Sequence, residues 1–188
     1  MIDLTVITCT IPERAQMLAQ LAAALDAQTV RPEWMIEIDD SGHGPVPNLN
    51  RLVDRADTEW VFRLDDDDLV DTEHFEILSA HLTDDFDVVY SWPRIDPTPA
   101  DGRFTEDGLQ VVFPLASLEE RNFIASAAAV RRSLWVELGG LSNVPEEDAD
   151  FWVRAWRAGA RFRCIPQVTW TYRLGDWPHR SDKEAVRD

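Results

Sequence analysis

Lysine and cysteine are scarce in this sequence, and each scarcity excludes a class of protein. The one lysine among 188 residues is Lys183, and the formal net charge is -17. Such an acidic chain lacks the broad Lys/Arg face that neutralises phosphates, so we do not expect a nucleic-acid partner. The two cysteines, Cys9 and Cys164, lie far apart and outside any CxxC pattern. They predict buried thiols in a reducing compartment and argue against a disulfide framework or a zinc site.

Long apolar runs and an export signal are missing as well. No run approaches the roughly 18 apolar residues of a membrane-spanning helix. The N-terminal Met-Ile-Asp-Leu-Thr-Val-Ile has no basic region followed by an apolar stretch and a cleavage site. We therefore expect no membrane span and a cytoplasmic location. The chain is 45% hydrophobic, which suits one well-packed domain over residues 1–188.

Strand-like and helix-like segments alternate through the first half of the chain. Short apolar runs predict strands over residues 2–8, 34–38, 60–64 and 87–90. Helical spacing of apolar residues predicts helices over residues 12–25, 48–56 and 71–82, the last capped by Asp71. This order predicts an α/β fold with a doubly wound, mostly parallel mixed sheet flanked by helices.

The second half breaks the alternation. Residues 91–108 are rich in Pro, Asp and Gly and predict a loop, with a short hairpin as an alternative. After that loop, we expect a helical turn over 115–121, a strand over 123–130, helices over 131–138 and 145–158, and strands over 162–165 and 168–173. No internal repeat or long linker divides the chain.

Acidic residues directly follow two of the predicted strands. Asp39 and Asp40 end the second strand, and four aspartates at residues 65–68 end the third. Because ligands bind beyond the carboxyl ends of parallel strands, we expect both clusters on one rim. The four aspartates offer the hard oxygen ligands that Mg²⁺ and Mn²⁺ prefer. The alternatives are a solvated turn that caps the next helix, and simple turn formation at Asp39 and Asp40.

A third acidic cluster, Glu-Glu-Asp-Ala-Asp at residues 146–150, begins a predicted helix. Its structural explanation is the helix dipole, which favours negative charge in a first turn, together with a pair between Asp150 and Arg154. The functional alternative is that a carboxylate held at this helix start removes a proton from an incoming hydroxyl.

Taken in order, these segments resemble the inverting family 2 glycosyltransferases of the GT-A fold. The resemblance covers nearly the whole chain. It rests on residues 5–8 with Arg14, and on residues 36–42, 48–51, 61–68, 138–141, 147–154, 162–166 and 172–173. It implies a nucleotide-sugar-binding half, residues 1–90, and an acceptor-binding half, residues 91–188.

The resemblance also implies roles for individual residues. It makes Asp148 the general base and makes Asp67 and His179 ligands of Mn²⁺ or Mg²⁺. The residues that it implies in donor binding are Thr8, Arg14, Asp39, Asp40, Asn50, Asp65, Asp66 and Arg173.

The implied activity is metal-dependent transfer, with inversion, of one sugar from a nucleotide-diphosphate donor to an acceptor hydroxyl. A UDP-sugar is the family's commonest donor, and a saccharide or another hydroxyl-bearing molecule is the expected acceptor. The missing C-terminal extension of processive members predicts a single addition. One alternative is a non-catalytic nucleotide- and metal-binding module of the same fold. The other is a sugar-1-phosphate nucleotidyltransferase, which the lack of glycine in residues 9–14 disfavours.

Overall fold

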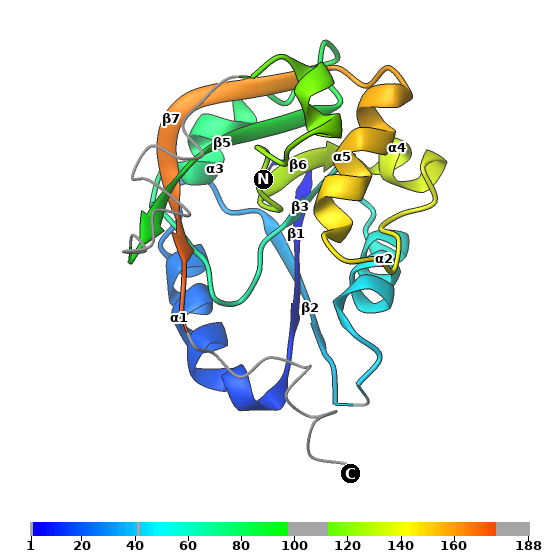
Figure 1. Cartoon of the computed structure of the whole chain (residues 1–188). Helices are drawn as coiled ribbons and strands as arrows, with labels where there is room; N and C mark the ends of the chain where they lie inside the picture. The colour runs from blue at the N-terminus through cyan, green and yellow to red at the C-terminus, as the bar shows by residue number, and fades with distance from the viewer. Residues whose placement is uncertain (1, 41, 98–112, 176–188) are drawn as a thin grey trace.

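The computed structural model describes residues 2–40, 42–97 and 113–175, which form a seven-stranded sheet with helices on both faces (Figure 1). The strands are β1 (Leu4–Thr10), β2 (Glu33–Ile38), β3 (Trp60–Arg63), β4 (Leu69–Val70), β5 (Val88–Asp96), β6 (Ala128–Arg131) and β7 (Phe162–Arg173). The α-helices are α1 (Ala15–Asp26), α2 (Pro45–Arg55), α3 (His74–Ser79), α4 (Arg132–Glu137) and α5 (Glu147–Arg157). Two 3₁₀ helices are η1 (Pro12–Arg14) and η2 (Leu115–Glu119). Within these ranges, no helix has the length and apolar character needed to cross a membrane.

The sheet is mixed, and its order is β2-β1-β3-β6-β5-β7-β4. β1 pairs in parallel with β2 and β3, and β5 pairs in parallel with β7. β6 lies antiparallel between β3 and β5, and β4 lies antiparallel beside β7. Strands β1, β2, β3, β5 and β7 therefore share one direction, which confirms the mostly parallel α/β sheet. The first four predicted strands correspond to β1, β2, β3 and β5, and β6 separates β3 from β5 in the sheet.

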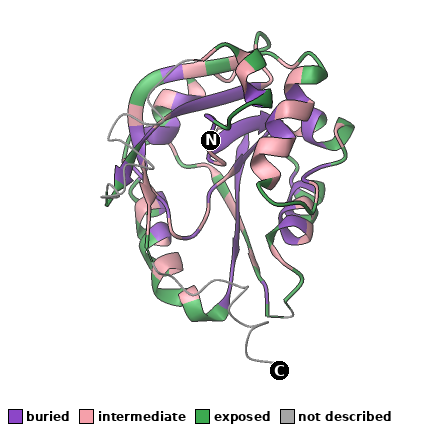
Figure 2. Ribbon diagram, in the orientation of Figure 1, coloured by how far each residue is buried: buried purple, intermediate pink, exposed green. Residues whose placement is uncertain are grey.

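Side chains alternate across the central strands and form a core on each face of the sheet. Trp60 and Phe62 of β3 belong to the core that contains residues of α1 and α3. Val61 belongs to the other core, with residues of α2, α4 and α5. Cys9 lies in this second core and does not pair with Cys164 in a disulfide. Figure 2 shows the buried residues concentrated along the central strands.

The second half contains more strand than the sequence predicts. β5 continues to Asp96, so residues 91–96 of the expected loop are strand, and the expected boundary after residue 90 falls within β5. Residues 98–108 of that loop lie outside the described residues. β7 is a single strand across both expected final strands. The register of β5 against β7 shifts on both sides of Trp92. Such irregularities accommodate Pro93 and Pro166, which have no N–H to donate.

α3 is shorter than the helix predicted over residues 71–82, and Asp71 is not its N-cap. The Asp71 carboxylate instead pairs with Arg94 at 3.0 Å. The two residues of β4, which no predicted strand or helix covers, pair with β7 just before α3. The chain after the four aspartates therefore forms an edge strand of the sheet, beside β7.

Candidate active site

The acidic turn after β2 lies at the carboxyl edge of the parallel strands. The Asp39 amide donates to the Thr10 carbonyl at the end of β1, at 2.8 Å. The Asp39 side chain is 3% exposed and accepts the backbone N–H groups of His43 and Gly44, each at 3.0 Å. Asp40 is exposed. The turn-forming explanation therefore holds for Asp39, while base recognition by either residue stays a prediction.

The four aspartates after β3 alternate between buried and half-exposed positions. Asp66 and Asp68 are buried, whereas Asp65 and Asp67 are half-exposed. The buried Asp66 accepts the Thr10 hydroxyl and pairs with Arg14. Its oxygens therefore stabilise the turn from inside, and donor binding by Asp66 stays a prediction.

Two arginines that the resemblance implied in donor binding hold this run of aspartates. Arg14 pairs with Asp66 at 2.9 Å and also with Asp67. Arg173, at the end of β7, donates its backbone N–H to Asp68 at 3.1 Å, and its Nε donates to the Asp67 carbonyl. Residues 159 positions apart in the sequence thus meet at one turn, as the resemblance requires.

Burial leaves these carboxylates poorly stabilised as anions. It raises the pKa of Asp66, Asp67 and Asp68, and neighbouring carboxylates raise it further. Arg14 acts in the opposite sense on the pKa of Asp66 and Asp67. The Oδ2 atom of Asp68 is buried and accepts no hydrogen bond from the described residues. Excess negative charge on hard oxygen ligands fits a divalent cation.

No three His, Cys, Asp or Glu side chains converge into a preformed metal site within the part of the chain that the structure describes. His179 lies outside that part. Mg²⁺ usually takes one or two carboxylates and completes its shell with water and substrate phosphates. Asp67 and Asp65 fit that requirement, since both are half-exposed and the charge of Asp65 raises the pKa of Asp67.

Thr8 and Asn50, both implied in donor binding, have their polar atoms engaged inside the fold. The buried Thr8 hydroxyl donates to the Leu64 carbonyl at 2.8 Å and accepts the Trp34 indole N–H at 3.0 Å. Asn50 bonds both backbone groups of Leu141, accepting its N–H at 2.9 Å and donating to its carbonyl at 3.0 Å. Donor binding by Thr8 and Asn50 stays a prediction, since the resemblance fixed positions in the chain and not the directions of side chains.

Asp148, the predicted base, borders a cleft of about 430 Å³. Its Oδ2 accepts the Asn122 amide at 3.0 Å, and its Oδ1 accepts the backbone N–H of Ala149 at 2.8 Å. Burial raises the pKa of Asp148, and the charge of Arg63 partly offsets that rise. A carboxylate whose pKa is raised towards neutrality is a better proton acceptor than an ordinary aspartate. The cleft is lined by Asn122, Ile124, Ala125, Ser126, Glu146, Asp148 and Tyr172.

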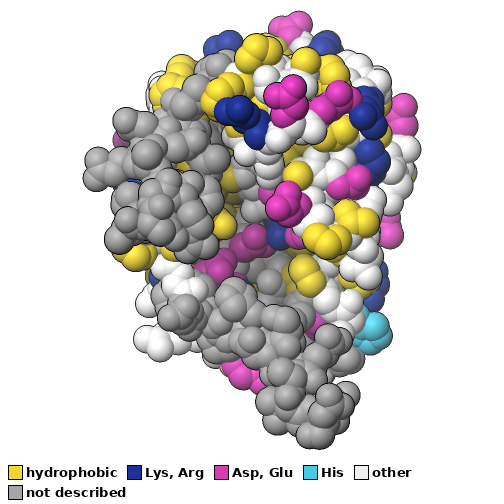
Figure 3. Space-filling view, in the orientation of Figure 1, with side chains coloured by type: hydrophobic (Ala, Val, Ile, Leu, Met, Phe, Trp, Pro, Cys, Tyr) yellow, Lys and Arg dark blue, Asp and Glu magenta, His cyan; other side chains and the backbone are white. Residues whose placement is uncertain are grey.

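Tyr172 links this cleft to the four aspartates. Burial and the negative charges of Asp68 and Asp65 raise the pKa of Tyr172 to about 12, and Asp148 contributes in the same sense. A single phenol therefore lies within electrostatic reach of both acidic clusters. Figure 3 shows acidic side chains gathered around the central hollow of this face. The sequence analysis quoted Tyr172 only as part of a motif and gave it no role.

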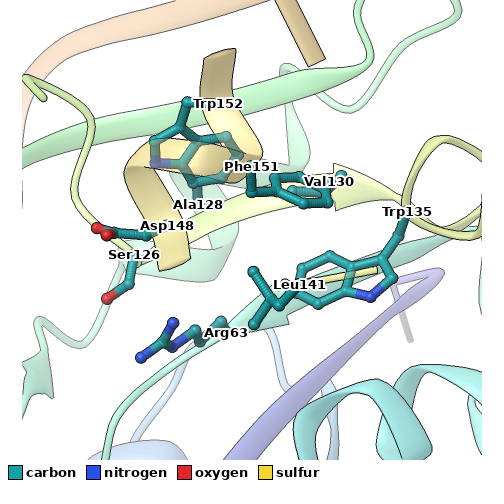
Figure 4. A pocket seen from close by; sticks show the side chains of 9 residues that line it. All are labelled: Arg63, Ser126, Ala128, Val130, Trp135, Leu141, Asp148, Phe151 and Trp152. Atoms are coloured by element: carbon teal, nitrogen blue, oxygen red, sulfur yellow. The ribbon is translucent and has the colours of Figure 1, made fainter. Parts of the chain in front are cut away.

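Arg63 is a site residue that the sequence analysis missed. Its Nε and Nη2 donate to the two oxygens of Asp65 at 3.0 and 3.1 Å, and its Nη1 donates to Glu147 at 2.9 Å. Burial alone would lower the pKa of Arg63, but the charges and hydrogen bonds of Asp65 and Glu147 raise it above the ordinary value. In Figure 4, Arg63, Ser126 and Asp148 lie on one side of a small cavity whose other walls are apolar. The sequence could have indicated Arg63, because a charged residue inside an apolar strand is buried and buried charges require partners.

A mixed sheet with a carboxylate run at the end of a parallel strand, and a further carboxylate beside a cleft, matches the GT-A class of glycosyltransferase folds. The family model described as "Glycosyl transferase family 2" matches residues 37–134, more than half of the chain. The chain belongs to this family. No curated protein matches its sequence.

Solved structures of glycosyltransferases share the fold. Residues 1–349 of S. aureus TarS in complex with UDP-GlcNAc match with a TM-score of 0.74 and 15% identity, over 95% of this chain and 60% of that one. The mannosyltransferase PcManGT from Pyrobaculum calidifontis, in complex with GDP-Man and Mn²⁺, matches with a TM-score of 0.69 and 17% identity. That match covers 100% of this chain and 65% of PcManGT. The chain thus spans less than two thirds of either relative.

Proposed function

We propose that this chain is a metal-dependent inverting glycosyltransferase that moves one sugar from a nucleotide-diphosphate donor to an acceptor hydroxyl. The observation that carries the proposal is the cleft bordered by Asp148, because two other residues that line it reach the four aspartates: Ser126 donates to Asp65 at 3.3 Å, and Tyr172 lies within electrostatic reach of the run. This supports placing the proton acceptor close to the metal-type carboxylates.

On the donor side, Asp67 and Asp65 would hold Mn²⁺ or Mg²⁺, and the predicted ligand His179 would complete the set. Such a cation neutralises the charge of a departing diphosphate. Arg173 is held at the same turn by Asp68 and adds positive charge there. Asp39 and Asp40 are proposed to meet the nucleotide base. UDP and GDP donors are both represented among the structural relatives, and a UDP-sugar stays the prediction for this chain.

On the acceptor side, Asp148 takes the proton of the attacking hydroxyl. The acceptor oxygen then bonds to the anomeric carbon from the face opposite the diphosphate, the bond from that carbon to the phosphate oxygen breaks, and the configuration inverts. The nucleoside diphosphate leaves with the bonding electrons, and Asp148 later releases its proton to solvent. The hydrogen bonds from Asn122 and Ala149 fix the carboxylate for this transfer.

The lining of the cleft supports an acceptor without phosphate groups. Glu146 and Asp148 are the charged residues among those that line it, and no Lys or Arg does so within the described ranges. An anionic acceptor would meet like charge, whereas a neutral saccharide would meet hydrogen-bonding groups and the ring of Tyr172. A cytoplasmic location stays a prediction from the sequence.

The proposal is tested by incubating the protein with UDP-GlcNAc and with GDP-Man, each with and without Mn²⁺, and measuring nucleoside diphosphate release and the melting temperature. We expect metal-dependent release from at least one donor, with water as acceptor. We also expect that donor to raise the melting temperature through binding to the native state. Metal-dependent stabilisation without release, from a wider panel of nucleotide-sugars as well, would favour the non-catalytic module instead.

A further inference from the structure

Arg63 occupies an unusual place for a charged residue. It ends β3, its side chain is 11% exposed, and its neighbours Phe62 and Leu64 are fully buried. On the β1 side it is paired in register with the buried Ile7. Taking a guanidinium into such surroundings costs free energy unless partners compensate it, so this position demands an explanation.

The alternation of β3 sends Arg63 to the face of the sheet that α5 covers. Arg63 is two residues after Val61, which packs in the core shared with α5, and residues two apart on a strand share a face. The side chain therefore runs along the sheet towards the first turn of α5, where Glu147 accepts its Nη1.

The guanidinium joins the two sides of the proposed site. Nε and Nη2, on one edge of the guanidinium, donate hydrogen bonds to the two oxygens of Asp65. Nη1 donates to Glu147, which directly precedes Asp148. The Ser126 hydroxyl donates a further hydrogen bond to Asp65 at 3.3 Å. We propose that Arg63 is a positioning residue that sets the distance between the donor-side Asp65 and the base-bearing start of α5. The inference rests on the proposed function, since it concerns the alignment of donor and base.

A lysine could not replace this arrangement. The planar guanidinium offers donors in a fixed fork, so it orients Asp65 and Glu147 together, whereas an ammonium supplies a point charge without directional constraint. A misplacement of about 1 Å at a reacting centre can cost on the order of 10²-fold in rate. The fork therefore matters for turnover more than for donor affinity.

The same guanidinium also acts on the base through its charge. The groups that face Asp148 are Arg63 on β3, Glu147 on α5, Tyr172 on β7 and the neutral amide of Asn122. Arg63 is the cation among them, and its charge lowers the pKa of Asp148, while Glu147 raises it. Removing the positive charge would keep Asp148 protonated to a higher pH. The acidic limb of the pH–rate profile would therefore shift to higher pH.

The test compares Arg63→Met and Arg63→Lys with wild type in the Mn²⁺-dependent hydrolysis of UDP-GlcNAc or GDP-Man, whichever the wild type accepts. We expect kcat to fall on the order of 10²-fold in Arg63→Met, a larger fall than any loss of calorimetric affinity for the nucleoside diphosphate. Its acidic limb should shift to higher pH. Arg63→Lys keeps the charge and loses the fork, so kcat should fall while the acidic limb stays in place.

Two further variants separate positioning from folding. Glu147→Gln weakens the same contact from the α5 side, because it removes the negative charge with little change in size, and kcat should fall there too. Arg161→Met removes another two-bond Arg–Asp pair, with Asp87 at 2.9 Å for both bonds, at an exposed position away from the cleft. It should leave kcat unchanged. A wild-type protein without turnover would overturn the proposed function. Wild-type turnover that survives both Arg63→Met and Glu147→Gln would overturn the inference alone.

Discussion

The strand-end cluster (residues 65–68) and the helix-start cluster (residues 146–150) have similar composition and very different structures. In the strand-end cluster, neighbouring side chains point in opposite directions. Asp66 and Asp68 are therefore buried against Arg14 and the backbone of Arg173, and their neighbours remain half-exposed. The turn is closed by the Asp68 amide, which donates to the Asp65 carbonyl at 3.1 Å, and this turn leaves two carboxylates out of four half-exposed for ligand binding.

In the helix-start cluster, successive side chains turn by about 100° around the helix axis. Glu147 consequently contacts Arg63, Asp148 faces the cleft, and Asp150 pairs with Arg154 at 2.8 Å on the helix surface. Each carboxylate has a separate environment. The comparison teaches that a run of acidic residues carries little meaning until its backbone geometry assigns each side chain a direction.

The largest effect is expected from a substitution of Asp148 in the helix-start cluster. Asp148→Asn should lower turnover about 10²–10⁴-fold, the range contributed by a general base, and leave donor affinity unchanged in calorimetry. Asp150→Asn is the matched control, because it makes the same chemical change two residues later in a surface pair with Arg154. Equal losses of turnover in the two variants would contradict the assignment of Asp148 as the base.

The second prediction concerns a substitution of Asp67 in the strand-end cluster. Here we expect donor binding to weaken, whereas Asp148→Asn should leave it unchanged. Asp67→Asn should weaken Mn²⁺-dependent donor binding by at least about 10-fold, the lower end reported for partners of metal ligands. Chelation of the metal in the wild type should have a similar effect. The control is Asp54→Asn on the exposed face of α2. Donor binding that is insensitive both to chelation and to Asp67→Asn would argue against a metal at this turn.

A third, smaller effect tests the loop that leads towards the helix-start cluster. Gly139 and Gly140 have φ angles of +76° and +78°, but only at Gly140 would a Cβ atom meet Asn50, 2.5 Å from its Oδ1. Gly139→Ala should cost about 1–2 kcal/mol from the left-handed conformation alone. Gly140→Ala should cost about 1 kcal/mol more, because Asn50 must give up its hydrogen bonds. Urea unfolding of both variants measures the difference, and equal losses would contradict a structural role for Asn50.

The smallest expected effect concerns a buried histidine, whose pKa shifts in the opposite direction from that of the buried aspartates. His74 at the start of α3 is 1% exposed, and burial lowers its pKa from 6.5 to about 4. Below pH 6.5 the unfolded chain binds a proton that the folded chain does not, so the free energy of unfolding decreases as the pH falls. Between pH 7.5 and 5.5 this group should remove about 1 kcal/mol. The carboxylates with raised pKa act with the opposite sign, so the readout is the pH dependence of wild type minus that of His74→Asn. If the difference in the free energy of unfolding between wild type and His74→Asn did not change with pH, the lowered pKa of His74 would be contradicted.

Local patterns predicted most of the elements and the rim where the acidic turns meet. Residues 60–64 read as a buried strand because they are apolar, and the turn that follows could be placed at the edge of a parallel sheet. The position of β6 could not be predicted in this way. Its short run of small residues looks the same beside any strand, and its pairing with β3 depends on contacts between residues 67 to 71 positions apart in the sequence, from Phe62↔Ala129 to Trp60↔Arg131.

The site was predicted in part for a related reason. Arg14 and Arg173 contact the aspartate turn, and their role in donor binding stays a prediction. The same is true of Thr8 and Asn50, because a segment's place in the chain does not say whether its side chain faces the rim or the core. Arg63 could have been found from its charge alone, since an arginine flanked by Phe62 and Leu64 has to be paired.

The antiparallel strand between β3 and β5 has a consequence for biosynthesis. As the chain leaves the ribosome, β1, β2 and β3 can assemble early, but β3 keeps an unpaired edge until residues 128–131 have been translated. Exposed strand edges pair readily with other chains, and long-range strand pairing is slow. A truncated polypeptide that stops at residue 90 should therefore aggregate rather than accumulate as an independent nucleotide-binding unit.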